Sequence, residues 1–221
     1  MADKIEQREV GVKYPDLVLF GPPGCGKETQ GNILIEKFGY VRISTGNICR
    51  EHVKAQTPLG LVAQEYMYAG ELVPDKIIIQ MFQEEFKKIP GDASPLIDGF
   101  PRTEDQRQLF HEMMTKEGRD YEVVALTANT EDEEKALVER LVERAKTSGR
   151  TDDADPDVIR NRLKVYNEKT GVVLDRWKAE NKNIHKHSAI GEILGISEWI
   201  QKEVVEKYSQ RVKDVLDQEI S

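Results

Sequence analysis

The chain has 221 residues, of which 38% are apolar and 33% charged, and its formal net charge at pH 7 is −8. A chain of this length builds a proper hydrophobic core, as one domain or as a core with small inserts. The excess of acid argues against general affinity for nucleic acids or acidic membranes, so an anionic ligand must be met by a local cluster of cations.

The N-terminus and the cysteines point to a cytoplasmic protein. Residues 1–14 are polar and lack the apolar stretch of a secretory signal, so they predict a flexible extension before a single domain over 15–221. No stretch approaches the roughly 18 apolar residues of a membrane-spanning helix. Cys25 and Cys49 lack metal-type spacing and predict reduced thiols without a disulfide.

Short apolar stretches alternate with helical patterns along the chain. Strands are predicted over 17–20, 40–45, 95–98, 121–128 and 184–189. A strand-then-helix alternation is typical of the α/β class, in which helices cover both faces of a parallel sheet. We therefore expect a five-stranded parallel sheet flanked by helices.

The predicted helices have recognisable ends and faces. The first covers 28–38 and stops at Gly39, and residues 46–70 form two helical pieces broken by the sequence TPLG. After Pro74 the apolar residues that share one helix face are Ile77, Ile78, Met81, Phe82 and Phe86. The charged helical tail over 198–219 has as its apolar positions Trp199, Ile200, Val204 and Val205.

The first predicted strand is followed by the sequence GPPGCGKETQ, residues 21–30. Its glycines let the backbone curl so that successive N–H groups face inward, and the following helix directs its positive end at the same place. Lys27 then reaches a β- or γ-phosphate. The usual pattern has Ser or Thr directly after the lysine, whereas this chain has Glu28, followed by Thr29. An ordinary glycine turn is the alternative, but the strand before and the helix after favour a phosphate site.

A second motif, LIDGFPRTEDQ, covers residues 96–106. Asp98 closes a strand at the carboxyl edge of the sheet, where α/β proteins bind ligands, and an acid there holds magnesium through its waters. Arg102 offers a planar fork for a second phosphate. A turn-capping acid and a surface cation are the alternatives for these two residues.

An arginine cluster surrounds the polar loop KTSGRTDD, residues 146–153. Arg140 and Arg144 project from one helix face, because they lie four residues apart. The loop suggests a small flap that folds over a charged ligand, and the alternative is a solvated helix surface whose arginines pair with Glu139 and Glu143. The cluster consists of Arg140, Arg144, Arg150, Arg160 and Arg162.

The histidines show no spacing of metal ligands, and no Ser/His/Asp set is evident. His185 and His187 alternate on a predicted strand and are interpreted as packing or surface residues. A glycine loop, a lysine, a magnesium-binding acid and several arginines are instead the set needed where two phosphate chains meet.

Taken together, GPPGCGKETQ, STGNICR, GELVP, DGFPRTEDQ and TSGRTDD…RL have the order and spacing of nucleoside monophosphate kinases. From residue 15 to about residue 195 the chain resembles a short-lid adenylate kinase. The resemblance implies transfer of the γ-phosphoryl group of ATP, with Mg²⁺, to a monophosphate. It also implies a P-loop kinase core with two inserts, a monophosphate-binding insert at about 46–76 and a short lid at about 143–154.

The resemblance assigns roles on the donor side. Lys27 stabilises the migrating phosphoryl group, Asp98 anchors magnesium through water, and Gly191 lies against the donor base. Asp152 and Asp153 orient the arginines of the lid. The implied ATP-binding residues are Gly24, Cys25, Gly26, Lys27, Glu28, Thr29, Arg140, Arg144 and Gly191. The implied catalytic residues are Lys27, Arg102, Arg140, Arg144, Arg150 and Arg162.

On the acceptor side, the resemblance places Arg50 and Arg102 on the α-phosphate of AMP. Thr45 and Gln106 favour adenine, because an amide side chain both donates to and accepts from the adenine edge. The implied AMP-binding residues are Thr45, Gly46, Arg50, Glu71, Leu72, Val73, Gly99, Phe100, Pro101, Arg102, Gln106, Arg150 and Arg162. The alternative acceptors are UMP and CMP.

The chain departs from the family pattern at Glu28 and Asn47, which replace a glycine and an acid, and at Ala145, which replaces a glycine. One residue is also inserted between Asp153 and Arg162. Glu28 raises a rival hypothesis, a nucleotide-binding scaffold with low activity. Because every cation of the pattern is present, an active kinase is the preferred interpretation, and it is expected to work as a monomer.

Overall fold

The computed structural model describes residues 14–148, 155–180 and 182–220. Five strands of this described part form one sheet: β1 (Asp16–Phe20), β2 (Val41–Ser44), β3 (Pro95–Asp98), β4 (Tyr121–Thr127) and β5 (Ile184–Ser188). Between β1 and β4 lie α1 (Lys27–Phe38), α2 (Thr45–Lys54), α3 (Pro58–Ala69), α4 (Asp75–Phe86) and α5 (Glu104–Lys116). Beyond β4 come α6 (Glu131–Ser148), α7 (Pro156–Val165), the π-helical turn η2 (Tyr166–Thr170), α8 (Gly171–Ala179), α9 (Ile193–Ile200), the π-helical segment η3 (Gln201–Glu206) and α10 (Lys207–Ile220).

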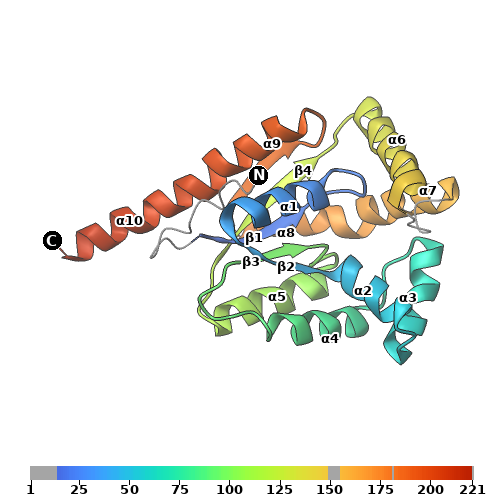
Figure 1. Ribbon diagram of the computed structural model, residues 1–221, viewed down its shortest axis with the longest axis horizontal. Coiled ribbons are helices and arrows are strands. Elements are labelled where there is room, and N and C mark those ends of the chain that lie inside the picture. Colours follow the sequence, from blue (N-terminus) through green and yellow to red (C-terminus); the bar gives the residue numbers. More distant parts are fainter. Residues whose placement is uncertain (1–13, 149–154, 181, 221) are drawn as a thin grey trace, which may run out of the picture.

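All neighbouring strands of the sheet are parallel, in the order β2-β3-β1-β4-β5 (Figure 1). This confirms the expected α/β class and the five-stranded parallel sheet. The order of the strands in the sheet differs from their order in the chain. Strands that are distant in the sequence therefore have neighbouring carboxyl ends. Ser44 at the end of β2, for example, lies opposite Asp98 at the end of β3.

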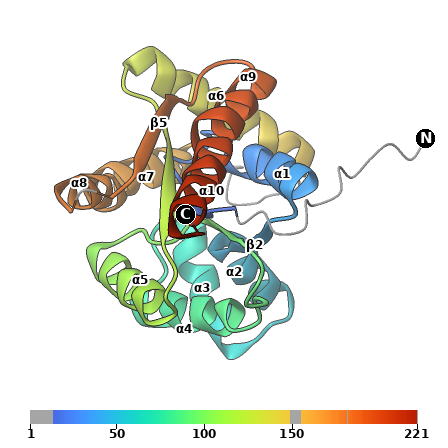
Figure 2. The same ribbon diagram turned by 90° about the vertical axis from the view of Figure 1, so that its left-hand side faces the viewer.

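Alternate residues of the strands pack into two separate hydrophobic layers. Leu17 and Leu19 of β1 belong to the layer formed with α1, α9 and η3, whereas Val18 and Phe20 belong to the layer formed with α4, α5 and α8. Figure 2 shows α4 and α5 on the opposite side of the sheet from α1 and α9. Because both faces are covered, the strands β1, β3 and β4 are buried along almost their whole length.

The predicted glycine stop of the first helix is confirmed. Gly39 adopts a left-handed conformation with φ 68°, and its N–H donates to Ile35 O at 2.9 Å. The break in the next helical region lies slightly earlier than the TPLG sequence. Thr57 caps α3 by accepting a hydrogen bond from Gly60 N, so Pro58 and Gly60 belong to the first turn of α3.

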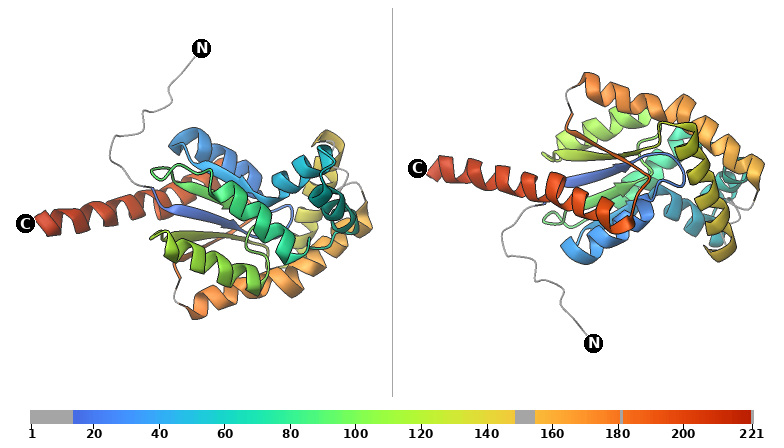
Figure 3. Two further views of the ribbon diagram at one scale, coloured as in Figure 1. Left: turned by 90° about the horizontal axis from the view of Figure 1, so that it is seen from below. Right: turned by 90° about the horizontal axis from the view of Figure 1, so that it is seen from above.

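The C-terminal helical region begins at Ile193, five residues before the predicted start at 198. Ile200, Val204 and Val205 are buried under the sheet, as their apolar pattern predicts. Beyond them, α10 extends away from the body of the protein (Figure 3). No helix in the described residues is long and apolar enough to cross a membrane.

Some predictions concern residues outside the described part. They include most of the predicted extension over 1–14 and the centre of the predicted lid, with Arg150, Asp152 and Asp153. Tyr14, the last residue of that extension, packs against Phe38 and Tyr40.

Candidate active site

Two adjoining cavities open at the carboxyl edge of the sheet, where the segments after β1, β2, β3 and β5 meet. Open α/β sheets bind their ligands at this edge. We call the one beside Thr45 and Gln106 the first cavity and the one beside the glycine loop the second cavity. Lys27, Arg50, Arg102 and Arg162 line both of them.

The glycine loop is held tightly between β4 and α6. A Cβ on Gly21 would come within 2.3 Å of Leu126 O, and one on Gly24 within 2.8 Å of Leu137 O. Both glycines also have positive φ, 147° and 82°. Only glycine fits at these two positions, and the loop is thereby pressed against its supports with its backbone facing the second cavity.

Lys27, the first residue of α1, folds back over the loop. Its Nζ donates to Gly21 O at 2.7 Å and to Pro22 O at 2.9 Å, and lies 3.2 Å from Cys25 Sγ. The ammonium group therefore stands within the cavity wall, where phosphate oxygens can replace these carbonyl partners.

Glu28 follows in the first turn of α1, with its side chain partly buried and in the wall of the second cavity. An acid in the first turn of a helix is favoured by the partial positive charge of the exposed N–H groups. Thr29 is exposed and also lines this cavity.

Further parts of the wall come from α6 and the segment after β5. Arg140 Nη1 donates to Ala189 O at 2.8 Å, which joins the two elements. All of the residues predicted to bind ATP line this second cavity, which has a volume of about 750 Å³. Volumes of roughly 300–1,000 Å³ are usual for small-molecule sites.

Asp98 lies in the same wall and is 8% exposed. Its Oδ2 accepts a hydrogen bond from Arg42 Nη2 at 2.5 Å, and Ser44 Oγ lies 3.5 Å from the same oxygen. The sequence reasoning overlooked Arg42 and Ser44. The available signal was their alternation along the strand that precedes Thr45.

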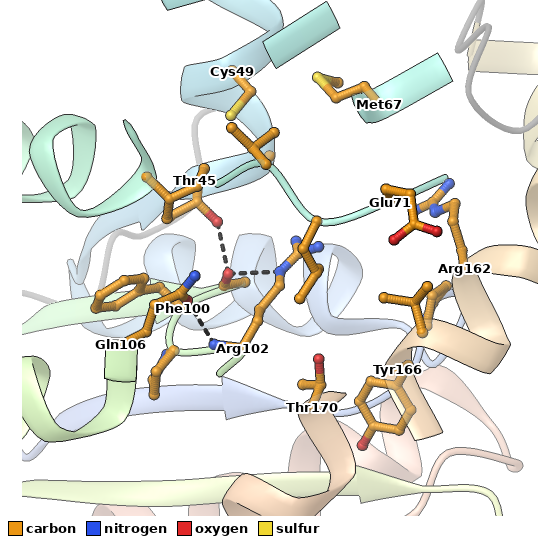
Figure 4. A pocket seen from close by; sticks show the side chains of 18 of the residues that line it. Thr45, Cys49, Met67, Glu71, Phe100, Arg102, Gln106, Arg162, Tyr166 and Thr170 are labelled. Atoms are coloured by element: carbon orange, nitrogen blue, oxygen red, sulfur yellow. Dashed lines mark hydrogen bonds between the residues drawn. The ribbon is translucent and has the colours of Figure 1, made fainter. Parts of the chain in front are cut away.

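In the wall of the first cavity, Thr45, Arg102 and Gln106 come from three different segments and lie close together (Figure 4). Gly99 O accepts hydrogen bonds from Thr45 Oγ1 and from Arg102 Nε, both at 2.7 Å. A Cβ on Gly99 would lie 2.8 Å from each of these side chains, so glycine allows them to meet. Gln106 Oε1 accepts from the Arg102 backbone N–H at 2.8 Å, which ties the arginine to the amide.

All of the described residues predicted to bind AMP line the first cavity. Arg50 donates from Nη2 to the Oδ1 of Asn47, so this amide orients the arginine. The prediction missed lining residues on two sides of this cavity, Met67 on one side and Tyr166 with Thr170 on the other (Figure 4). Such residues carry no sequence signal of their own, because apolar side chains at helical spacing usually indicate core.

The remaining candidates lie elsewhere. Arg160, a member of the arginine cluster without an assigned role, pairs with Asp157 on the surface of α7. His185 Nε2 lies 2.7 Å from Glu122 Oε2, and His187 packs against Trp199, which agrees with the interpretation of the two histidines as packing or surface residues. Cys25 and Cys49 are free and buried, and burial raises the pKa of the Cys49 thiol. No cluster of three or more His, Cys, Asp or Glu side chains able to hold a metal occurs in the described residues.

The family model for adenylate kinase matches residues 19–182. The chain is 42% identical to the adenylate kinase of Flavobacterium psychrophilum over 187 residues, 85% of this chain and 96% of that protein. It is 42% identical to the adenylate kinase of a Synechococcus species over 168 residues, 76% of this chain and 85% of that protein. With the adenylate kinase of Parabacteroides distasonis the identity is 38% over 182 residues, 81% and 94% of the two chains.

Proposed function

Since the chain belongs to the adenylate kinase family and is a nucleoside monophosphate kinase, we propose that it converts ATP and AMP reversibly into two ADP, with ATP in the second cavity and AMP in the first. The observation that supports this assignment best is the junction of the cavities. Lys27, Arg50, Arg102 and Arg162 line both, so four cations surround the point at which two phosphate chains would meet. This arrangement suits transfer between two anions that would otherwise repel each other.

For this transfer the protein must align the two substrates and stabilise negative charge. A phosphoryl group passes between two oxygens through a loose, highly charged transition state, so catalysis relies on alignment and electrostatic stabilisation. Lys27 accompanies the migrating group from the donor side. Arg50 and Arg102 hold the α-phosphate of AMP on the acceptor side, and Arg162 neutralises the charge between them.

The donor nucleotide is held along the second cavity. The backbone of Gly24–Thr29 cradles its phosphates at the N-terminus of α1. Arg140 and Arg144 approach from α6, and Gly191 leaves a backbone surface for the base. Arg150, which lies outside the described residues, is proposed to join the catalytic arginines from the lid.

Mg²⁺ enters with ATP as part of the substrate. Carboxylate and hydroxyl oxygens are the ligands that this hard cation prefers, usually through retained waters. Asp98 and Ser44 offer such oxygens at the carboxyl ends of β3 and β2, so the residues present fit the metal. When bound, the ion would supply charge neutralisation on the phosphates, and Asp98 would hold it.

AMP is preferred over UMP or CMP in this proposal. Gln106 is 1% exposed and Thr45 is 3% exposed, and both belong to the wall of the first cavity. A buried amide rejects a base that cannot match its donor and acceptor, because an unmatched polar group in a dry site is costly.

We also propose that the segment at about 46–76 and the one at about 143–154 are moving inserts on a core of residues 15–221. The first cavity has a volume of about 130 Å³, well below the roughly 300 Å³ at which small-molecule sites begin. AMP therefore needs more room than this cavity offers, and we infer that α2 and α3, which carry Thr45, Arg50 and Met67 of its wall, move outward to admit it. Closure of the inserts would exclude water, which otherwise turns transfer into hydrolysis.

A cytoplasmic monomer completes the proposal. Both cysteines are free thiols, as expected in a reducing compartment. Sedimentation at micromolar concentration, with and without nucleotides, measures the oligomeric state.

The reaction is tested by a coupled assay of ADP formation with ATP, AMP and Mg²⁺. We expect turnover that requires all three, and a kcat/KM for AMP well above those for CMP and UMP. A preference for CMP or UMP would make the chain a pyrimidine monophosphate kinase. ATP binding without turnover, on any of the three acceptors, would favour the scaffold hypothesis raised by Glu28.

A further inference from the structure

Arg42 is a cation in the wall of the second cavity that the proposed roles leave unused. It starts from β2 and its side chain is 13% exposed. Its Nη2 donates to Asp98 Oδ2 on β3 at 2.5 Å, and its Nη1 donates to Asn32 Oδ1 on α1 at 3.0 Å. Arg42 Nε is buried and has no hydrogen-bond partner among the described residues.

The pairing between Arg42 and Asp98 is end-on. A guanidinium that serves only as a partner for a carboxylate usually binds both carboxylate oxygens through two nitrogens. Here one nitrogen contacts Oδ2, and Oδ1 of Asp98 accepts no hydrogen bond from any described residue. One carboxylate oxygen therefore stays open, beside a fixed positive charge.

This charge bears on the form in which ATP is bound. A free carboxylate at the carboxyl end of β3 attracts a divalent cation, whereas a carboxylate paired with a guanidinium is neutral as a unit and attracts it less. The same guanidinium attracts the triphosphate itself. Arg42 therefore weakens the advantage of metal-bound ATP over metal-free ATP.

We propose that the charge of Arg42, placed beside Asp98, sets the balance between metal-free and metal-bound ATP in the second cavity. The inference rests on the proposed donor role of that cavity. It makes Arg42 a determinant of how strongly ATP binding depends on Mg²⁺, and not a brace between β2 and β3.

The test measures binding and not turnover. Isothermal titration calorimetry gives the Kd of ATP in excess chelator and the Kd of ATP in saturating Mg²⁺, for the wild type, Arg42→Gln and Arg42→Met. In both variants we expect weaker binding of metal-free ATP and tighter binding of Mg·ATP. The ratio of the two Kd values should rise about tenfold or more, because one full charge is removed next to the phosphates and the metal.

Two matched variants separate charge from fold. Arg42→Lys retains the charge without the planar fork, so its ratio should stay close to that of the wild type. Arg211→Gln removes the same charge from an ion pair with Glu122, whose Oε1 lies 2.6 Å from Arg211 Nη2 near the amino end of β4. The ratio should not change in Arg211→Gln, because this pair is remote from the second cavity.

An unchanged ratio in both neutral Arg42 variants, together with a lowered melting temperature, would show a structural brace and overturn the inference. An equal change in Arg42→Lys and Arg42→Gln would overturn it as well, because charge would not be the cause. A wild type that binds ATP in neither condition would overturn the donor assignment itself, and the inference with it.

Discussion

Gln106 Nε2 donates to Asp75 Oδ1 at 2.7 Å, and this bond fixes the direction in which the Gln106 amide faces. Thr103 Oγ1 donates to the other oxygen of Asp75 at 2.6 Å, and Gln106 Oε1 accepts from Arg102 N. The amide is left with one N–H and one lone pair for a base. Its donor and acceptor thus have a set order along the edge of the first cavity.

Asp75→Asn should relax the choice of purine. An asparagine can present its own N–H₂ to Gln106, so the amide gains a reversed orientation in which it matches the 6-oxo edge of IMP. We expect the ratio of kcat/KM for AMP to that for IMP to fall about tenfold, the cost of one mismatched polar contact. Asp105→Asn is the control, because the same change there concerns an exposed residue on α5, the helix that carries Gln106. An unaltered ratio in Asp75→Asn would mean that the Arg102 N–H alone orients the amide.

Arg102→Lys should lower kcat by about 100-fold or more, because charge without the planar fork loses bidentate contact with phosphate in the transition state. The bond from Nε to Gly99 O is lost as well. Steady-state kinetics and circular dichroism measure turnover and fold. The control is Arg160→Lys, because Arg160 forms an exposed ion pair with Asp157. This variant should have the kcat of the wild type. Near-normal turnover in Arg102→Lys would show that Arg102 does not contribute to catalysis.

Glu28→Gly should tighten ATP binding. At ~4 Å and an effective dielectric constant of about 20, a carboxylate and a phosphate charge repel by about 4 kcal/mol before screening. The position of Glu28 in the wall of the second cavity makes this repulsion relevant. Titrations with ATP at low and high free Mg²⁺ measure the effect.

The Mg²⁺ dependence of ATP affinity distinguishes three possible roles of Glu28. Tighter binding at both Mg²⁺ levels is the expected outcome. Weaker binding of the glycine variant, mainly at low Mg²⁺, would instead identify Glu28 as a ligand of the metal. Equal affinities throughout would leave it a first-turn acid without influence on the nucleotide.

Tyr121→Phe should destabilise the fold by about 1–3 kcal/mol, because it leaves a buried donor without its acceptor. Trp177 Nε1 donates to Tyr121 Oη at 3.0 Å, and the two side chains are 0% and 1% exposed. Urea denaturation gives the free energy of unfolding. Tyr68→Phe removes a hydroxyl that accepts from Gln64 on the surface and should change stability little. Equal effects of the two substitutions would contradict the argument.

Acid should weaken the fold partly through Glu104. Hydrogen bonds from Arg107 hold the pKa of this carboxyl below its ordinary value. The stabilisation is therefore complete above the unfolded pKa of about 4.3 and is lost as the pH falls through the lower folded pKa. Glu104→Gln should lower the melting temperature at pH 7. Between pH 5 and pH 3, the melting temperature of this variant should fall less than that of the wild type. Glu112→Gln, an exposed change on the same helix, should follow the wild-type profile.

Much of the local structure was determined by the sequence itself. The glycine loop, the stop at Gly39 and the five strands depend on backbone freedom and on apolar patterning within short segments. These properties depend on neighbouring residues, so the sequence of one short segment is enough to predict the loop, the helix stop or the strand that it forms. The family resemblance added the expected site residues, and every one that the structure describes lines one of the two cavities.

The convergence of these residues was decided by tertiary structure. The order β2-β3-β1-β4-β5 and its register bring Ser44 opposite Asp98, although 53 residues separate them in the chain. That alignment lets Arg42, which no motif singled out, reach Asp98 from the neighbouring strand. Arg160 and Arg162, by contrast, lie on different faces of α7 because they are two residues apart on one helix, so only Arg162 lines the cavities. Sequence patterns report which residues share a face of one element, but the partners across elements follow from how the whole sheet and its helices pack.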